Sequence, residues 1–73
     1  MGTDVERIRE QYPQGTKLRL LKDLDDPYAP KRAGDVMTVS HVDDAGQVHG
    51  TWKSGGSLAL LYGVDAFDVI SRP

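Results

Sequence analysis

Hydrophobic and polar residues alternate in short runs along most of the chain, which is the pattern of half-buried β-strands. In the run over residues 16–21, Leu18 and Leu20 are expected to point into a core. Lys17 and Arg19 occupy the intervening positions and would face solvent. Four further runs follow at residues 36–42, 47–53, 57–61 and 66–70. The pattern therefore predicts five short strands.

The first residues of the chain follow a helical spacing instead. Val5, Ile8 and Tyr12 recur at three- and four-residue intervals and form one narrow apolar stripe. Pro13 disfavours helical geometry at the residue before it, so the spacing predicts a helix over residues 3–12. A helix this short is marginal alone, and we expect its stripe to dock on the strands.

Local signals mark the start of the helix and the turns between strands. Thr3 and Glu6 have the spacing of a capping box, which predicts the first turn of the helix. Residues 43–46 read Asp-Asp-Ala-Gly, which favours a type I turn followed by a left-handed conformation at Gly46. Further turns are predicted at residues 54–56 and 62–65.

Residues 22–35 break the strand pattern. The stretch contains an aspartate cluster, Asp23, Asp25 and Asp26, together with two prolines, which prevent a regular central strand. It is predicted to be a long loop after the first strand, and loops of this length in compact domains are often functional.

The order of these elements predicts the fold class. A long loop after the first strand and a one-turn kink before the last are features of SH3-like barrels. Five short strands in 73 residues favour closure, because closure limits exposed sheet edges. The predicted fold is mainly β, a small SH3-like five-stranded barrel over residues 16–70 with a short N-terminal α-helix. The whole chain, residues 1–73, is predicted to be a single domain.

Composition narrows the class of protein further. The chain is 38% hydrophobic and 27% charged, which fits a soluble globular domain. It has no cysteine, so disulfides, thiolate metal sites and a cysteine nucleophile are excluded. The charged N-terminal segment lacks the apolar stretch of a secretory signal, and we expect a cytoplasmic location and no membrane partner.

The net charge of −2 is unevenly distributed along the chain. Residues 1–22 carry five positive and three negative side chains, whereas residues 23–73 carry four positive and eight negative ones. A barrel of this size that binds nucleic acid normally presents a basic face. The mildly basic first strand is more simply a solvated strand face, so a nucleic-acid partner is not expected.

The acidic loop and nearby aromatic residues are the candidate binding surface. SH3-type domains bind extended peptides through aromatic side chains from comparable regions. Asp25, Asp26, Tyr28 and Tyr62 are the predicted partner-binding residues. Trp52, the single tryptophan, is expected to lie in the core instead.

The same loop allows two other interpretations. Closely spaced carboxylates at Asp23, Asp25 and Asp26 could hold a divalent cation, but the longer ligand pattern of a calcium loop is missing. The simpler expectation is a solvated loop in which these side chains accept backbone N–H hydrogen bonds. No metal and no cofactor is therefore predicted.

His41 and His49 are the remaining candidates for chemistry. If the hairpin loop has three residues, the two histidines lie opposite each other. If the loop has an even number of residues, they lie on opposite faces of the sheet. Even a facing pair offers two ligands where zinc needs at least three from protein. No serine lies in a nucleophile elbow, and the chain is not expected to be an enzyme.

Several segments of the chain resemble one known family. These segments are ERIREQYPQGTKLRLL, DDPYAP, GDVMTVSHVDDAGQVHGTW and GGSLALLYGVDAFDVI. The parts most specific to the family are DDPYAP, VDDAGQ, Trp52 and the run that contains SLAL, GVD and F. Together they resemble a bacterial and phage family catalogued as domain of unknown function 4314. The resemblance implies an SH3-like domain found on bacterial chromosomes and mobile elements, without an assigned activity. Leu61 and Tyr62 depart from it, since the family pattern has a proline there.

Three functions stay open on the sequence. The leading expectation is a small non-enzymatic interaction module that binds another protein through the acidic-aromatic loop. The first alternative is a phage or mobile-element accessory protein that inhibits a host defence complex, since an acidic protein can act as a decoy for basic surfaces. The second is a nucleic-acid-binding SH3-like domain.

Overall fold

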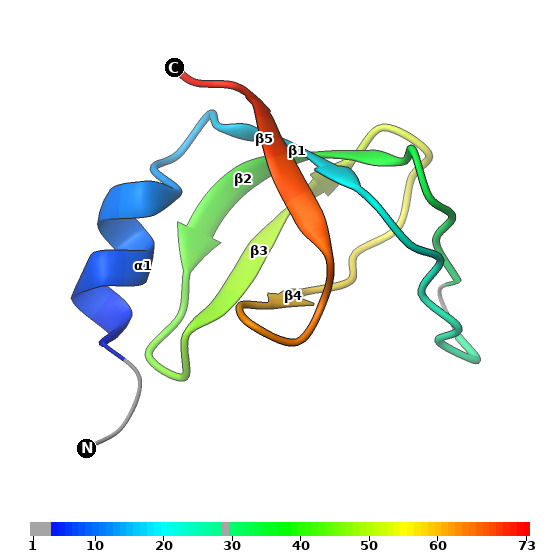
Figure 1. The fold of residues 1–73 in the computed structure, drawn as a ribbon, viewed down its shortest axis with the longest axis horizontal. Coiled ribbons are helices and arrows are strands. Elements are labelled where there is room, and N and C mark those ends of the chain that lie inside the picture. The colour runs from blue at the N-terminus through cyan, green and yellow to red at the C-terminus, as the bar shows by residue number, and fades with distance from the viewer. Residues whose placement is uncertain (1–3, 29) are drawn as a thin grey trace.

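Within the described residues, six segments form regular structure, in the order that the hydrophobic pattern predicts. The computed structural model describes residues 4–28 and 30–73. Its elements are α1 (Val5–Gln11), β1 (Lys17–Leu20), β2 (Val36–Val42), β3 (Gln47–Trp52), β4 (Leu60–Leu61) and β5 (Phe67–Ser71). The strands form one antiparallel sheet in the order β4-β3-β2-β1-β5, with α1 at one end and the loop after β1 at the other (Figure 1). The prediction of a mainly β fold with one N-terminal helix is confirmed.

The predicted closure into a five-stranded barrel is wrong. β4 and β5 are the two edges of the sheet and are not hydrogen-bonded to each other. β4 contains two residues, whereas the sequence predicted a strand over residues 57–61. The carbonyl of Leu58 accepts a hydrogen bond from the Trp52 indole at 2.9 Å, so a side chain rather than a strand ladder holds this segment. A two-residue strand offers too short an edge to close the sheet.

The core lies on the inner face of the sheet. In β1, Leu18 and Leu20 are buried, and Lys17 and Arg19 are exposed, as the alternation predicts. The hydrophobic residues of the core are Ile8, Leu18, Leu20, Met37, Val39, Val42, Val48, Trp52 and Leu60. The inner face is therefore apolar and the outer face of β1 is basic.

The helix docks on this core through its predicted stripe. Ile8 is buried, and Val5 and Tyr12 pack against the core while partly exposed. The helix starts one residue later than a Thr3 cap would place it, because the N-cap is Asp4, whose carboxylate accepts from the Arg7 N–H at 3.3 Å. Thr3 itself lies outside the described residues. No helix in the described part of the chain has the length and apolar character needed to cross a membrane.

Arg9 joins the helix to the hairpin of β2 and β3. Its guanidinium donates to the Val42 carbonyl at 3.1 Å and to the Asp44 carboxylate at 2.8 Å. It also donates to Glu6, one helical turn earlier, at 2.7 Å. The forked guanidinium makes three bonds in different directions, so one side chain fixes the position of α1 beside the turn.

The turn between β2 and β3 has the predicted chemistry. The Gly46 N–H donates to the Asp43 carbonyl at 3.0 Å, and Gly46 has φ +85°. The loop proper has three residues, so His41 lies opposite His49 in the register. Of the two arrangements open on the sequence, the facing pair is the one formed.

Gly50 marks a close approach of β2 and β3 that the sequence did not reveal. A Cβ at this position would lie 2.2 Å from the Thr38 carbonyl oxygen and 2.8 Å from Met37 Cγ. Val39 pairs with Gly50, and the register shifts just beyond this pair. The missing side chain therefore allows the strands to approach where the ladder is irregular.

We expect Gly50→Ala to destabilise the fold by about 3 kcal/mol, because the new methyl group would push a backbone carbonyl out of the ladder. Chemical denaturation measures the free energy of unfolding. Thr51→Ala is the matched control, since Thr51 is the exposed next residue of the same strand, and it should change stability little. Equal stability of Gly50→Ala and wild type would contradict the close approach.

Candidate functional site

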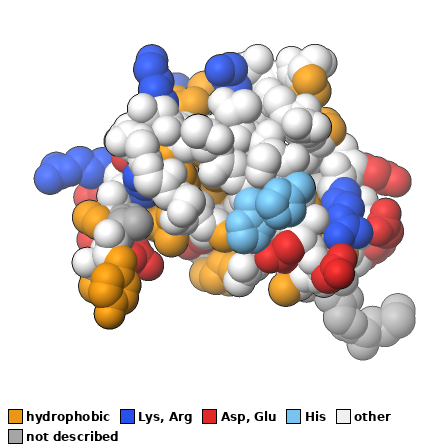
Figure 2. Space-filling view, turned by 180° about the vertical axis from the view of Figure 1, so that it is seen from behind, with side chains coloured by type: hydrophobic (Ala, Val, Ile, Leu, Met, Phe, Trp, Pro, Cys, Tyr) orange, Lys and Arg blue, Asp and Glu red, His pale blue; other side chains and the backbone are white. Residues whose placement is uncertain are grey.

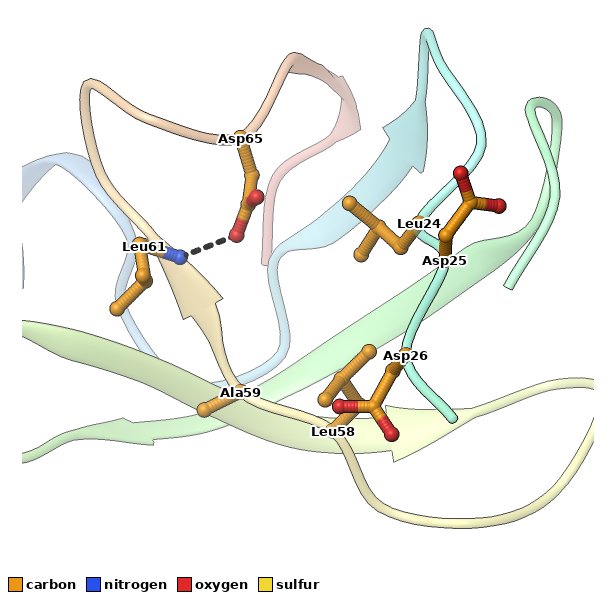
Figure 3. A pocket seen from close by; sticks show the side chains of 7 residues that line it. All are labelled: Leu24, Asp25, Asp26, Leu58, Ala59, Leu61 and Asp65. Atoms are coloured by element: carbon orange, nitrogen blue, oxygen red, sulfur yellow. Dashed lines mark hydrogen bonds between the residues drawn. The ribbon is translucent and has the colours of Figure 1, made fainter. Parts of the chain in front are cut away.

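A pocket opens between the loop after β1 and the segment that contains β4. Its volume is about 260 Å³. It is lined by Leu24, Asp25, Asp26, Leu58, Ala59, Leu61 and Asp65, and we call it the acidic pocket. Figure 3 shows the loop residues on one side of it and the β4 segment and the following turn on the other. Two segments more than thirty residues apart in sequence thus form its two walls.

The loop wall is held by hydrogen bonds within the loop. Leu24 and Lys31 pair through their backbones, with N–H to carbonyl distances of 2.7 and 3.1 Å. The Asp23 carboxylate accepts from the Ala33 N–H at 2.8 Å, and the Asp26 carboxylate accepts from the Tyr28 N–H at 2.8 Å. Two of the clustered aspartates therefore organise the loop backbone, as expected for a solvated acidic loop.

Lys31 ties this loop to the turn after β3. Although charged, its side chain is almost fully buried, and the residue is 6% exposed. Its ammonium group donates to the Gly55 carbonyl and to Ser54 Oγ, the latter at 3.3 Å. It also lies 5.3 Å from the centre of the Trp52 ring, within cation–π range. A buried ammonium requires such partners, so the contact fixes the loop against the sheet.

Trp52 also holds the opposite wall. Its indole N–H donates to the Leu58 carbonyl at 2.9 Å, and the residue is 2% exposed, which confirms the predicted core position. Beyond β4, the Asp65 carboxylate accepts from the Leu61 N–H at 2.8 Å (Figure 3). Trp52 thus contacts both walls of the pocket, the loop through Lys31 and the β4 segment through the Leu58 carbonyl.

The lining of the pocket combines two kinds of chemistry. Leu24, Leu58 and Leu61 supply apolar surface, and the carboxylates of Asp25, Asp26 and Asp65 supply negative charge. A Lys or Arg side chain has the matching combination of an apolar stem and a cationic end.

The four predicted partner-binding residues do not form one site. Asp25 and Asp26 line the acidic pocket. Tyr28 is 94% exposed and is not among the lining residues. Tyr62, which is 44% exposed, packs on Tyr12 at a ring distance of 6.0 Å, beside the end of α1. It belongs to an aromatic contact between the helix and the turn before β5, which agrees with a packing role.

The two histidines form a stacked pair on the hairpin. The rings of His41 and His49 are 4.7 Å apart and nearly parallel, at 5°. His49 Nε2 is hydrogen-bonded to Asp43 Oδ2 at 2.7 Å, and His41 Nδ1 to the Ser40 hydroxyl at 3.0 Å. Within residues 4–28 and 30–73, no group of three or more His, Cys, Asp or Glu side chains is arranged to hold a metal ion.

Asp43 is the electrostatic centre of this turn. Its hydrogen bond with His49, followed by the bond from the Gln47 N–H at 2.9 Å, lowers the pKa of the Asp43 carboxyl below its ordinary value. The Ala45 N–H adds a third bond at 2.9 Å. These bonds favour the ionised carboxylate, so the charge stabilises the hairpin.

The geometry defines a class of protein, namely a small β-rich domain with a side-chain-sized acidic pocket. The chain belongs to the family described as Domain of unknown function (DUF4314), whose profile matches residues 1–70. No match was found among curated proteins or among solved structures.

Most residues of the acidic pocket were not predicted from the sequence. Leu24, Leu58, Ala59, Leu61 and Asp65 were not among the candidate residues. A signal was present, however, because DDPYAP and the SLAL and GVD pieces are among the segments most specific to the family resemblance. The structure brings parts of these segments together around one pocket.

Asp43→Asn keeps the shape of the side chain and removes its charge. Because hydrogen bonds lower the folded-state pKa of Asp43 below its ordinary value, the carboxylate contributes stability at neutral pH, and the contribution is lost as the pH falls through the folded-state pKa. We expect the stability advantage of wild type over the variant to shrink between about pH 5 and about pH 2. Thermal unfolding of both proteins over this range measures the difference.

Asp25→Asn is the control for removing one carboxylate, since Asp25 forms no hydrogen bond or ion pair with the described residues. A difference between wild type and Asp43→Asn that stays constant over the range would show that the Asp43 charge does not support the turn.

Proposed function

We propose that this chain is a small non-enzymatic interaction module that binds another protein through the acidic pocket. The observation that carries the proposal is the lining of the pocket, in which leucine side chains lie beside three carboxylates. Its partner would present a Lys or Arg next to an apolar residue, so that the stem packs on the leucines and the cation meets the carboxylates.

The size of the pocket favours a side chain over a cofactor. At about 260 Å³ it lies below the usual range of small-molecule sites, which begins at about 300 Å³. Asp25 is exposed and has no partner among the described residues, so its carboxylate is available to a ligand. A single basic side chain on a docked segment would fill such a site.

The strand order supports an SH3-like origin for this module. A meander from β1 to β4, with β5 returning to pair with β1, is the order of strands in SH3-like barrels. In SH3-type domains the peptide surface includes the long loop after the first strand. The acidic pocket uses the corresponding loop here, although the sheet is open.

Selection of displayed random peptides on the immobilised domain tests the proposal. We expect enrichment of peptides with a Lys or Arg beside an apolar residue. Asp25→Lys should weaken binding of a selected peptide by about tenfold, because it replaces attraction by repulsion at the pocket rim.

Glu10→Lys is the matched control. It makes the same charge change at an exposed position of α1, away from the acidic pocket, and should leave peptide affinity nearly unchanged. Selected peptides without basic residues, or equal affinity for wild type and Asp25→Lys, would refute the proposal.

A further inference from the structure

The outer face of the sheet carries a second surface with the opposite charge. Thr38 of β2 pairs with Lys17 on one side and with Thr51 on the other, so the three residues form one row across β1, β2 and β3. Lys53 follows β3, and its N–H donates to the Val36 carbonyl in the next row. We call this surface the basic face.

A hollow of about 470 Å³ lies on the basic face. It is lined by Lys17, Val36, Thr38, Thr51, Trp52, Lys53 and Ile70. The threonine hydroxyls share it with two lysines, and Val36 and Ile70 add apolar surface. The hollow therefore offers cations and hydroxyl donors around an apolar floor.

None of the residues that line the hollow is acidic. Lys17 and Lys53 form no ion pair within the described residues. Arg19, also exposed on β1, pairs with Asp68 at 3.3 Å. The histidine pair continues the same face along β3, since His49 lies two residues before Thr51. Figure 2 shows the histidines on the face it displays, with Lys or Arg side chains along its upper edge and Asp or Glu side chains below and beside the histidines.

We propose that the basic face binds the sugar-phosphate backbone of single-stranded nucleic acid, with a base over Val36 and Ile70. Lysine and threonine side chains are regular donors to phosphate oxygens. A hollow on a small open sheet face can take an unstacked base, which a duplex does not present. This partner lies beyond the protein partner of the acidic pocket and uses a different surface.

The proposal departs from the expectation drawn from net charge. The net charge of −2 is a sum over the chain, and it conceals an acidic pocket and a basic face that lie on different parts of the fold. An acidic protein segment would also be attracted by Lys17 and Lys53. Nucleic acid is favoured because two threonine hydroxyls lie in the same hollow as the lysines, which suits an anion with several oxygens, and because the apolar floor suits a flat base.

Fluorescence anisotropy with fluorescein-labelled single-stranded RNA and DNA of mixed sequence tests this proposal on the full chain. We expect binding of at least one of them at low salt. The logarithm of the binding constant should fall with the logarithm of salt concentration at a slope of about −1.4, which corresponds to the two lysines of the hollow. The Lys17→Gln, Lys53→Gln double variant removes both cations and should bring the slope close to zero.

Lys22→Gln with Arg32→Gln is the matched control, since it removes two exposed positive charges that do not line the hollow. It should leave the slope unchanged. Three results would overturn the proposal: no binding to either strand at low salt, an equal loss of slope in the control, or polyglutamate competing as well as unlabelled oligonucleotide. The last result would assign the face to an acidic protein segment.

Discussion

The acidic pocket depends on one contact, in which the Lys31 side chain binds Trp52 and the turn after β3. Trp52 is the last residue of β3 and is buried in the core. Both its aromatic ring and its indole N–H make contacts with other segments. Its ring accepts the Lys31 ammonium, and its indole N–H holds the Leu58 carbonyl. One aromatic residue therefore connects the sheet to both walls of the acidic pocket. Besides this contact, the long loop is joined to the sheet at its ends and by Leu24, which packs against the core.

The local features of the fold could be predicted from the sequence because they depend on neighbouring residues. The alternation around Leu18, the helical stripe around Ile8 and the left-handed Gly46 are all properties of short segments. Closure of the sheet could not be predicted in the same way. It depends on whether the edge strands are long enough to meet, and β4 is shortened by a bond between Trp52 and Leu58 that no local pattern indicates.

The candidate site was only partly predictable for a related reason. Aspartates between prolines indicate a loop, and two of them, Asp25 and Asp26, do line a pocket. The sequence could not show that Leu58 and Asp65 face them, because that proximity depends on the tertiary fold. Lys31 has the sequence context of a solvated residue, yet its burial depends on distant carbonyl and aromatic partners. The net charge was also a poor guide to possible partners, because it does not show that acidic and basic side chains lie on different parts of the surface.

Amide hydrogen exchange in Lys31→Met tests the central role of this contact most directly. The variant keeps an apolar side chain of similar length and removes the ammonium group, with Lys22→Met as the exposed control. The amides of Leu24 and Lys31 donate to each other's carbonyls in the loop wall. We expect their exchange to quicken by about tenfold or more in Lys31→Met, with little change in β2 and β3. Unchanged exchange at both amides would contradict the account.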